Sequence, residues 1–162
     1  MTDIIQKVSK KLHKNNLTLV SAESCTGGWV AKKITDLEGS SAILDRGFVT
    51  YSNQAKIDML GVSKETLDNY GAVSKQVVIE MVEGALNNSQ ADIALSISGI
   101  AGPGGGTIEK PVGTVCFGWM MRGNQPFSDT IYIEGDRDSV RYKAVDFALS
   151  GVVKLIDELN NS

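Results

Sequence analysis

The sequence predicts an α/β fold, a three-layer α/β/α sandwich built on a mixed sheet. Segments with helical periodicity alternate with short strand-like segments through the earlier part of the chain, which is typical of α/β folds. Two strand-like segments then follow each other without a helix between them, which indicates adjacent strands in the same sheet. The 162 residues contain no linker, repeat or low-complexity tract. One domain over residues 1–162 is therefore expected.

The elements of the first half follow from apolar spacing and helix caps. Ile4, Val8 and Leu12 recur every four residues and form one apolar face of a helix. Asn53 is expected to cap a short helix, and Gly61 to end it in a left-handed conformation. In chain order we expect a helix over 3–15, a strand over 17–21, a helix over 29–35, a strand over 43–51, and short helices over 53–60 and 63–70.

The second half contains the most apolar strand. Ser74 is a suitable N-cap for a helix with a clear buried face. The strand over 91–98 is almost continuously apolar, which favours a central position covered on both faces. The remaining expected elements are strands over 112–120 and 130–134 and a closing helix over 137–159.

Composition favours a small ligand over a nucleic acid. The net charge is −3 and the pI is near 5.2, whereas nucleic-acid-binding proteins normally carry a basic surplus that replaces counterions at phosphates. An anionic ligand must therefore be met by a few placed cations or by backbone amides.

The chain is expected to be cytoplasmic, without a membrane partner. Its N-terminal residues lack the apolar core of a signal peptide, and no apolar run approaches membrane-spanning length. Cys25 and Cys116 are the only cysteines, and they form no CxxC motif. They are expected to be free thiols in a reducing compartment.

The scarcity of histidine restricts the chemistry. His13 is the only histidine, and its place on the polar side of the first helix favours a solvent-facing side chain. A Ser-His-Asp triad is excluded, as are ordinary zinc sites built on histidine. A hydrolase on this chain must activate its nucleophile with lysine, a carboxylate or tyrosine, and no metal is expected.

A polar turn that ends in two glycines follows the first strand. Three of its side chains can act as nucleophiles, those of Ser24, Cys25 and Thr26. Gly27 and Gly28 open the next helix, where free backbone amides can hold a phosphate or stabilise an oxyanion. A simple helix cap explains the pattern equally well.

Tyr51 and Lys56 form a second candidate site. Tyr51 ends a strand and Lys56 lies in the first turn of the helix that follows; ligands usually meet an α/β sheet at such strand ends. A lysine desolvated there has a lowered pKa and can serve as a base for serine. A surface lysine on a short amphipathic helix is the alternative, and the pattern alone favours it.

A glycine-rich segment follows the buried strand. Ser98 and Gly99 lead into Gly102-Pro103-Gly-Gly-Gly106, which indicates close backbone approach to another group. No Gly-Lys-Ser/Thr follows, so this is not a Walker A loop, and no helix follows Gly106, so a dinucleotide fingerprint is weak. A loop that covers a ligand and a flexible turn both remain open.

Two arginines begin the closing helix. Asp136 or Asp138 is expected to be its N-cap, which places Arg137 and Arg141 four residues apart on one face. Cations at a helix N-terminus oppose the macrodipole, so a shared anion such as a phosphate would explain them. Salt bridges to the neighbouring aspartates explain them equally well.

At these places the chain resembles the C-terminal domain of the CinA (competence-damage-inducible) family. The resemblance runs from about residue 4 to 158. It rests on six segments in order: Ala22-Glu-Ser-Cys-Thr-Gly-Gly28, Gly47-Phe-Val-Thr-Tyr-Ser-Asn53, Gly71-Ala-Val-Ser74, Ser96-Ile-Ser-Gly-Ile-Ala-Gly-Pro103, Lys110-Pro-Val-Gly-Thr114 and Gly135-Asp-Arg137.

The resemblance implies the α/β/α fold and an activity. Stand-alone members of the family are nicotinamide-nucleotide amidohydrolases, which convert nicotinamide mononucleotide and water into nicotinic acid mononucleotide and ammonia. A homodimer without cofactor is implied too. The N-terminal domain of longer CinA proteins is expected to be absent, so its activities are not carried over.

The resemblance and the residues together suggest a mechanism. Ser24 is expected to attack the carboxamide, with Lys56 as base and Tyr51 orienting Lys56 or relaying a proton. Backbone amides around Thr26–Gly28, or of Ser98 and Gly99, are expected to bind the oxyanion. Arg137 and Arg141 are expected to bind the phosphate.

Three alternatives remain open. Cys25 is a rival nucleophile, since a thiolate is intrinsically more reactive and Glu23 or Lys56 could activate it. A nucleotide-binding regulatory module without turnover would use the same glycines and arginines, but it would not need Ser24 together with Lys56. A nucleic-acid or competence factor, suggested by the family name, conflicts with the acidic balance.

Overall fold

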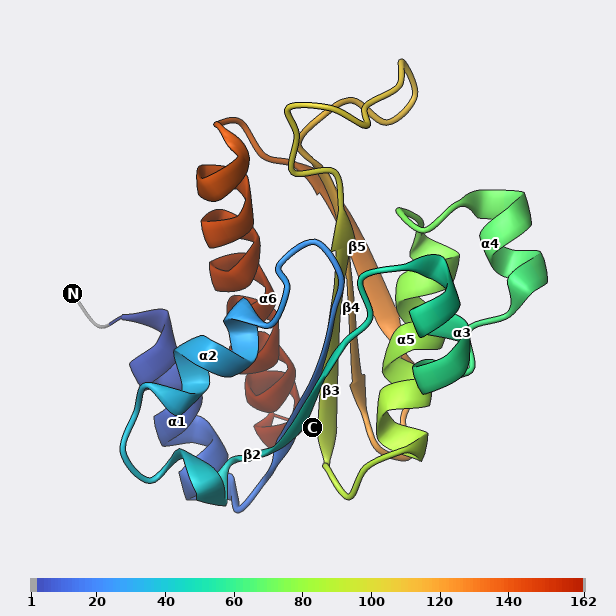
Figure 1. Cartoon of the computed structure of the whole chain (residues 1–162). Coiled ribbons are helices and arrows are strands. Elements are labelled where there is room, and N and C mark those ends of the chain that lie inside the picture. Colours follow the sequence, from blue (N-terminus) through green and yellow to red (C-terminus); the bar gives the residue numbers. More distant parts are fainter. Residues whose placement is uncertain (1–2, 162) are drawn as a thin grey trace.

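The computed structural model describes residues 3–161. A five-stranded sheet in the order β2-β1-β3-β4-β5 lies between two layers of helices (Figure 1). The strands are β1 (Leu19–Glu23), β2 (Leu44–Val49), β3 (Ile93–Gly99), β4 (Thr114–Met121) and β5 (Phe127–Tyr132). β1 pairs in parallel with β2 and β3, whereas β4 is antiparallel to both β3 and β5. The predicted three-layer sandwich with a mixed sheet is therefore confirmed.

Helices pack against both faces of the sheet (Figure 1). One layer contains α1 (Ile4–Asn15), α2 (Trp29–Thr35) and α6 (Arg137–Asn160). The other contains α3 (Asn53–Leu60), α4 (Lys64–Tyr70) and α5 (Lys75–Asn87). A 3₁₀ turn, η1 (Ser40–Ala42), precedes β2.

Alternation along the strands divides the core into two clusters. Leu19 faces α1, α2 and α6, whereas the next residue, Val20, faces α5. Both are fully buried, and burying one such side chain stabilises the fold by about 1.5–3 kcal/mol. On the α5 side the close approach depends on glycine. A Cβ on Gly84 would lie 1.8 Å from the carbonyl oxygen of Leu60, so only glycine lets α5 pack against the end of α3.

Most element boundaries agree with the sequence prediction to within two residues, and two strands are displaced. β1 begins at Leu19 rather than residue 17, because the amide of Thr18 bonds to the Asp92 carboxylate, 2.9 Å away, outside the strand ladder. β5 begins at Phe127, where it pairs with Trp119, rather than at residue 130. The sequence signal there was weak because β5 is an edge strand with several exposed residues.

The predicted caps are correct with one exception. Asn53 does not cap α3; Ser52 does, because its hydroxyl accepts the amide of Ala55 at 3.0 Å while Asn53 is already helical. Gly61 ends that helix with φ +68°, as predicted. Asp136 caps α6 through a 2.9 Å bond from the amide of Ser139.

The sheet topology brings three strand ends together. In register, Glu23 at the end of β1 pairs with Val49 of β2 and with Ile97 of β3, so these parallel strands end at one edge of the sheet. From β1 the chain enters α2 on one face, and from β2 it enters α3 on the other. Ligand sites of α/β sheets lie where connections diverge in this way.

Within residues 3–161, no helix combines the length and the apolar content that crossing a bilayer requires. The predictions of one domain over 1–162 and of no signal peptide include residues 1, 2 and 162, which lie outside the described range.

Candidate active site

A cavity of about 290 Å³ lies at this edge of the sheet. It brings together six of the residues singled out in the sequence, namely Ser24, Tyr51, Lys56, Ser98, Gly99 and Arg137. Asn53, Val73 and the glycine-rich loop complete the wall. The segments that follow β1, β2 and β3 therefore supply one site, together with the first turn of α6.

Lys56 and Ser24 are in direct contact at the base of the cavity. Nζ of Lys56 lies 2.8 Å from Oγ of Ser24 and 2.8 Å from the carbonyl oxygen of Thr50. A third bond, of 3.5 Å, runs to the carbonyl oxygen of Tyr51. Three acceptors thus surround the amine. If the amine loses one proton, its two remaining N–H groups can still donate to the two carbonyl oxygens. Its lone pair then points toward Oγ of Ser24.

Burial changes the acidity of Lys56. The residue is only 1% exposed, and the loss of solvation lowers its pKa from 10.5 to about 8. No carboxylate within salt-bridge distance offsets this among residues 3–161. The neutral amine is therefore accessible near physiological pH, as a general base requires. The sequence pattern alone favoured a surface lysine over a desolvated one, and the burial of Lys56 shows that the surface alternative is wrong.

Cys25 is placed less well for nucleophilic attack. Its side chain lines the same cavity but is only 8% exposed. Burial raises the pKa of its thiol to about 11, which suppresses the reactive thiolate. Lys56 donates to Ser24, and the geometry therefore favours Ser24 over Cys25.

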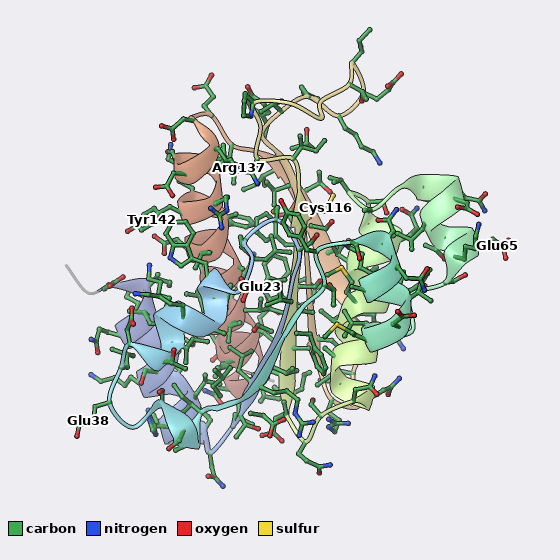
Figure 2. All side chains as sticks on the ribbon, in the orientation of Figure 1. Glu23, Glu38, Glu65, Cys116, Arg137 and Tyr142 are labelled. Atoms are coloured by element: carbon green, nitrogen blue, oxygen red, sulfur yellow. The ribbon has the colours of Figure 1, made fainter. Side chains whose placement is uncertain are left out.

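The phenol of Tyr51 bonds to Arg137 and not to Lys56. Its phenol oxygen accepts a 3.1 Å bond from Nη2 of Arg137, and only its backbone carbonyl contacts Lys56. Nη1 of Arg137 donates to the carbonyl of Gly102 at 2.8 Å. Arg137 thus spans the cavity mouth from the start of α6, above Glu23 and α2 in Figure 2.

Hydrogen bonds hold the glycine-rich loop at two points. Arg137 holds it at Gly102, and Lys110 donates from Nζ to the carbonyl of Tyr70 at 2.7 Å. Gly102 has φ +85°, and a Cβ there would lie 2.4 Å from Val112, so only glycine fits this turn. Gly102, Gly104 and Gly105 face the cavity, which supports the reading of this loop as a cover for a ligand.

The other predicted binding residues lie in a second cavity. Thr26, Gly27, Gly28 and Arg141 line it together with Trp29. Arg141 donates from Nε to the carbonyl of Cys25 at 3.0 Å and from Nη2 to that of Thr26 at 3.4 Å. Its guanidinium also lies over the Trp29 ring. Arg137 and Arg141 therefore occupy different surroundings, although they are one turn apart.

Glu23 caps a helix, a role that the sequence did not reveal. Its carboxylate accepts bonds from Thr26 Oγ1 at 2.6 Å, from the amide of Val30 at 2.9 Å and from that of Ala31 at 3.2 Å. It therefore caps α2, whose own N-cap position is occupied by Gly28 without a side-chain bond. The glycine pair could have indicated this role, because Gly27 and Gly28 have no side chain that can cap α2 and another residue must do so.

Residues 1–156 match the family model of the CinA C-terminal domain. The chain belongs to the CinA C-terminal domain family. Nicotinamide-nucleotide amidohydrolase PncC of Escherichia coli (strain K12) is 52% identical over 149 residues, which cover 92% of this chain and 90% of that protein. A putative competence-damage inducible protein of Symbiobacterium thermophilum is also 52% identical, and the match covers 91% of this chain but 36% of that protein.

Solved structures of CinA proteins share the fold. The competence/damage inducible protein CihA from Agrobacterium tumefaciens superposes with a TM-score of 0.90 at 43% identity and covers 96% of both chains. A CinA superfamily protein from Klebsiella pneumoniae gives 0.92 at 39% identity, also over 96% of both chains.

His13 and Cys116 of this CinA domain lie outside the cavity that contains Ser24 and Lys56. His13 is exposed on α1, as predicted. Cys25 and Cys116 are free thiols, and Cys116 contacts Thr130 at 3.3 Å. Between residues 3 and 161, no three histidine, cysteine, aspartate or glutamate side chains gather in a group that could hold a metal ion.

Proposed function

We propose that this protein hydrolyses the carboxamide of nicotinamide mononucleotide to nicotinic acid mononucleotide and ammonia, without a metal, in pyridine nucleotide recycling. The observation that carries the proposal is the buried amine of Lys56, 2.8 Å from Oγ of Ser24 in a cavity at the strand ends. The name of the 52% identical PncC protein supplies the substrate class.

A lysine so completely buried is hard to explain by stability alone. Removing an ammonium group from water costs several kcal/mol, which a surface lysine avoids. Ser24 and the carbonyl of Thr50 satisfy its hydrogen bonds, but they supply no opposite charge. The lowered pKa is what a catalytic base needs, and mere binding of a nucleotide does not require it.

The reaction would proceed through an acyl-enzyme. Neutral Lys56 takes the proton of Ser24 while Oγ forms a bond to the carboxamide carbon. The resulting ammonium gives that proton to the amide nitrogen, the C–N bond breaks and ammonia leaves. Water then attacks the ester, Lys56 accepts the water proton and returns it to Oγ of Ser24, and the acid is released.

Backbone amides are proposed to stabilise the tetrahedral oxyanion. The turn after Ser24 is one source, since its residues follow the nucleophile directly. Ser98 and Gly99 are the other, because they line the same cavity. In the turn, the amide of Gly27 is already bonded to the carbonyl of Ser24 at 3.0 Å, and Thr26, Gly27 and Gly28 line the second cavity, so Ser98 and Gly99 are the better candidates.

Arg137 is the proposed phosphate ligand. It stands at the mouth of the cavity, and its bonds to Gly102 and Tyr51 are made to neutral acceptors that a dianion can outcompete. Arg141 remains a weaker candidate, because it holds the carbonyls of the catalytic turn and lines the second cavity.

The wider setting is proposed on the same basis. An acidic chain with net charge −3 and two free thiols suits a cytoplasmic enzyme of small nucleotides that does not bind nucleic acid. A homodimer stays a prediction from the family resemblance; sedimentation at micromolar concentration tests it.

The test is product identification. Purified protein is incubated with nicotinamide mononucleotide in EDTA, and the nucleotide product is identified by mass spectrometry. Conversion of the amide to the acid supports the proposal. An unchanged nucleotide that nevertheless raises the melting temperature would instead indicate a binding module without turnover.

A further inference from the structure

The Glu23 carboxylate lies on the side of β1 that faces α2, away from the substrate cavity. The residue is 1% exposed and does not line that cavity. Figure 2 shows it between β1 and the start of α2. No cation lies within salt-bridge distance of it among residues 3–161. Its charge is stabilised instead by the hydroxyl of Thr26 and the first free amides of α2.

These bonds determine the shape of the turn that carries Ser24. Before the turn, the sheet holds the chain: the amide of Ser24 bonds to the carbonyl of Ile97 at 3.0 Å, and the carbonyl of Glu23 accepts the amide of Thr50 at 2.8 Å. After Ser24 the sheet ends, and the chain reverses through Gly27, with φ +60°, and Gly28, with φ +104°. The carboxylate joins the middle of this turn to the helix beyond it.

The carbonyl of Glu23 also links the two halves of the catalytic pair. It bonds to Thr50, whose own carbonyl accepts from Lys56. Ser24 follows Glu23 in the chain and contacts the same amine. A shift of the turn would therefore move Ser24 relative to Lys56, which α3 carries. Misplacing reacting groups by 1 Å costs about 10²-fold in rate.

We propose that Glu23 is a positioning residue, which holds Ser24 within reach of Lys56 by clamping the turn to α2 through Thr26. The inference rests on the proposed function for its kinetic readout. Glu23 has no contact with Ser24 Oγ or Lys56 Nζ, so it acts through Thr26 and the helix rather than on the substrate.

The central variant is Glu23→Gln, which keeps the shape of the side chain but turns one acceptor into a donor that faces a backbone amide. We expect kcat to fall about 10- to 100-fold with KM nearly unchanged, in protein that is folded by circular dichroism. Glu80→Gln is the matched control, because this half-buried carboxylate on α5 also accepts a backbone amide, from Ser63 at 2.8 Å, but does so at the start of α4, away from the turn that carries Ser24.

Variants of Thr26 distinguish two roles of Glu23, holding the turn in place and simply capping α2. Thr26→Val removes the hydroxyl while Val30 and Ala31 still bond to the carboxylate, so a pure capping role predicts wild-type kcat. The clamp predicts a reduced kcat, restored by Thr26→Ser. A Glu23→Gln protein that is folded and keeps wild-type kcat would overturn the proposal, as would a Thr26→Val protein with wild-type kcat.

A second readout does not depend on the nucleotide. The rate at which a fluorophosphonate probe labels Ser24, located by mass spectrometry, reports the reactivity of its hydroxyl directly. We expect slower labelling of Glu23→Gln and unchanged labelling of Glu80→Gln. If the wild type labels but does not convert the nucleotide, the proposed function fails while the labelling ratio still decides the role of Glu23; equal rates would refute it.

Discussion

Nζ of Lys56 lies 2.8 Å from Oγ of Ser24, although 32 positions separate the two residues in the chain. Parallel pairing of β1 with β2 creates this contact, because the turn after β1 carries Ser24 and the helix after β2 carries Lys56. The pair is the basis of the predictions that follow.

The pH dependence of activity should follow Lys56. Burial lowers its pKa from 10.5 to about 8, and only the neutral amine accepts a proton. We therefore expect kcat/KM to rise with pH and to level off above an apparent pKa of about 8. A rise that continues to the ordinary lysine pKa would show that Lys56 is solvated during the reaction.

The same shift links Lys56 to stability. Between pH 8 and 10.5 the unfolded chain holds a proton on Lys56 that the folded chain has lost. The free energy of unfolding should therefore rise with pH across this window, relative to a Lys56→Met variant that lacks the group. Urea denaturation of both proteins at the two ends of the window measures the difference; parallel curves would contradict a buried, shifted amine.

Tyr51→Phe distinguishes a proton relay from an indirect contact. The phenol bonds to Arg137, and the contact with Lys56 comes from the Tyr51 backbone, which the substitution keeps. We expect kcat within about threefold of wild type and a modest rise in KM. A loss of several orders of magnitude in kcat would show that the phenol takes part in proton transfer.

Arg137→Leu should act on binding. Losing one charge-assisted contact to a phosphate costs about 1.5–3 kcal/mol, so we expect KM to rise about 10- to 100-fold with a smaller change in kcat. Arg46→Leu, at an exposed arginine paired with Asp45 at the start of β2, is the control. Equal effects of the two substitutions on KM would remove Arg137 from the site.

Gly84→Ala tests whether close helix packing positions Lys56. A Cβ at Gly84 would lie 1.8 Å from the carbonyl oxygen of Leu60, the last residue of α3. Because the clash is with backbone atoms, α3 and α5 must move apart to relieve it. We therefore expect a loss of about 1–3 kcal/mol in unfolding free energy and a lower kcat. Gly104→Ala, where a Cβ meets nothing within 4 Å, should leave stability unchanged.

The sequence was informative where one local pattern determines one local structure. The spacing of Ile4, Val8 and Leu12 identified α1, and the apolar run after residue 91 identified β3 as a buried strand. The proximity of Ser24 and Lys56 was also foreseeable, because strand ends in an α/β sheet are shared ligand sites.

Other features depend on contacts that no local pattern contains. Glu23 caps a helix that begins six residues later, so neither its spacing nor its type identified the role. Arg137 and Arg141 share a helix face, yet the turn carrying Ser24 lies against one of them only. The burial of Lys56 depends on contacts with Ser24 and the Thr50 carbonyl, which the short segment around Lys56 does not reveal.

The most direct test of the serine–lysine mechanism is ammonia release from nicotinamide mononucleotide in EDTA, compared among the wild type, Ser24→Ala and Cys25→Ala. We expect Ser24→Ala to lose at least about 10³-fold in kcat, as expected for a nucleophile that acts as a unit with its base, and Cys25→Ala to stay active. A Ser24→Ala protein with near-wild-type turnover, or a loss confined to Cys25→Ala, would contradict it.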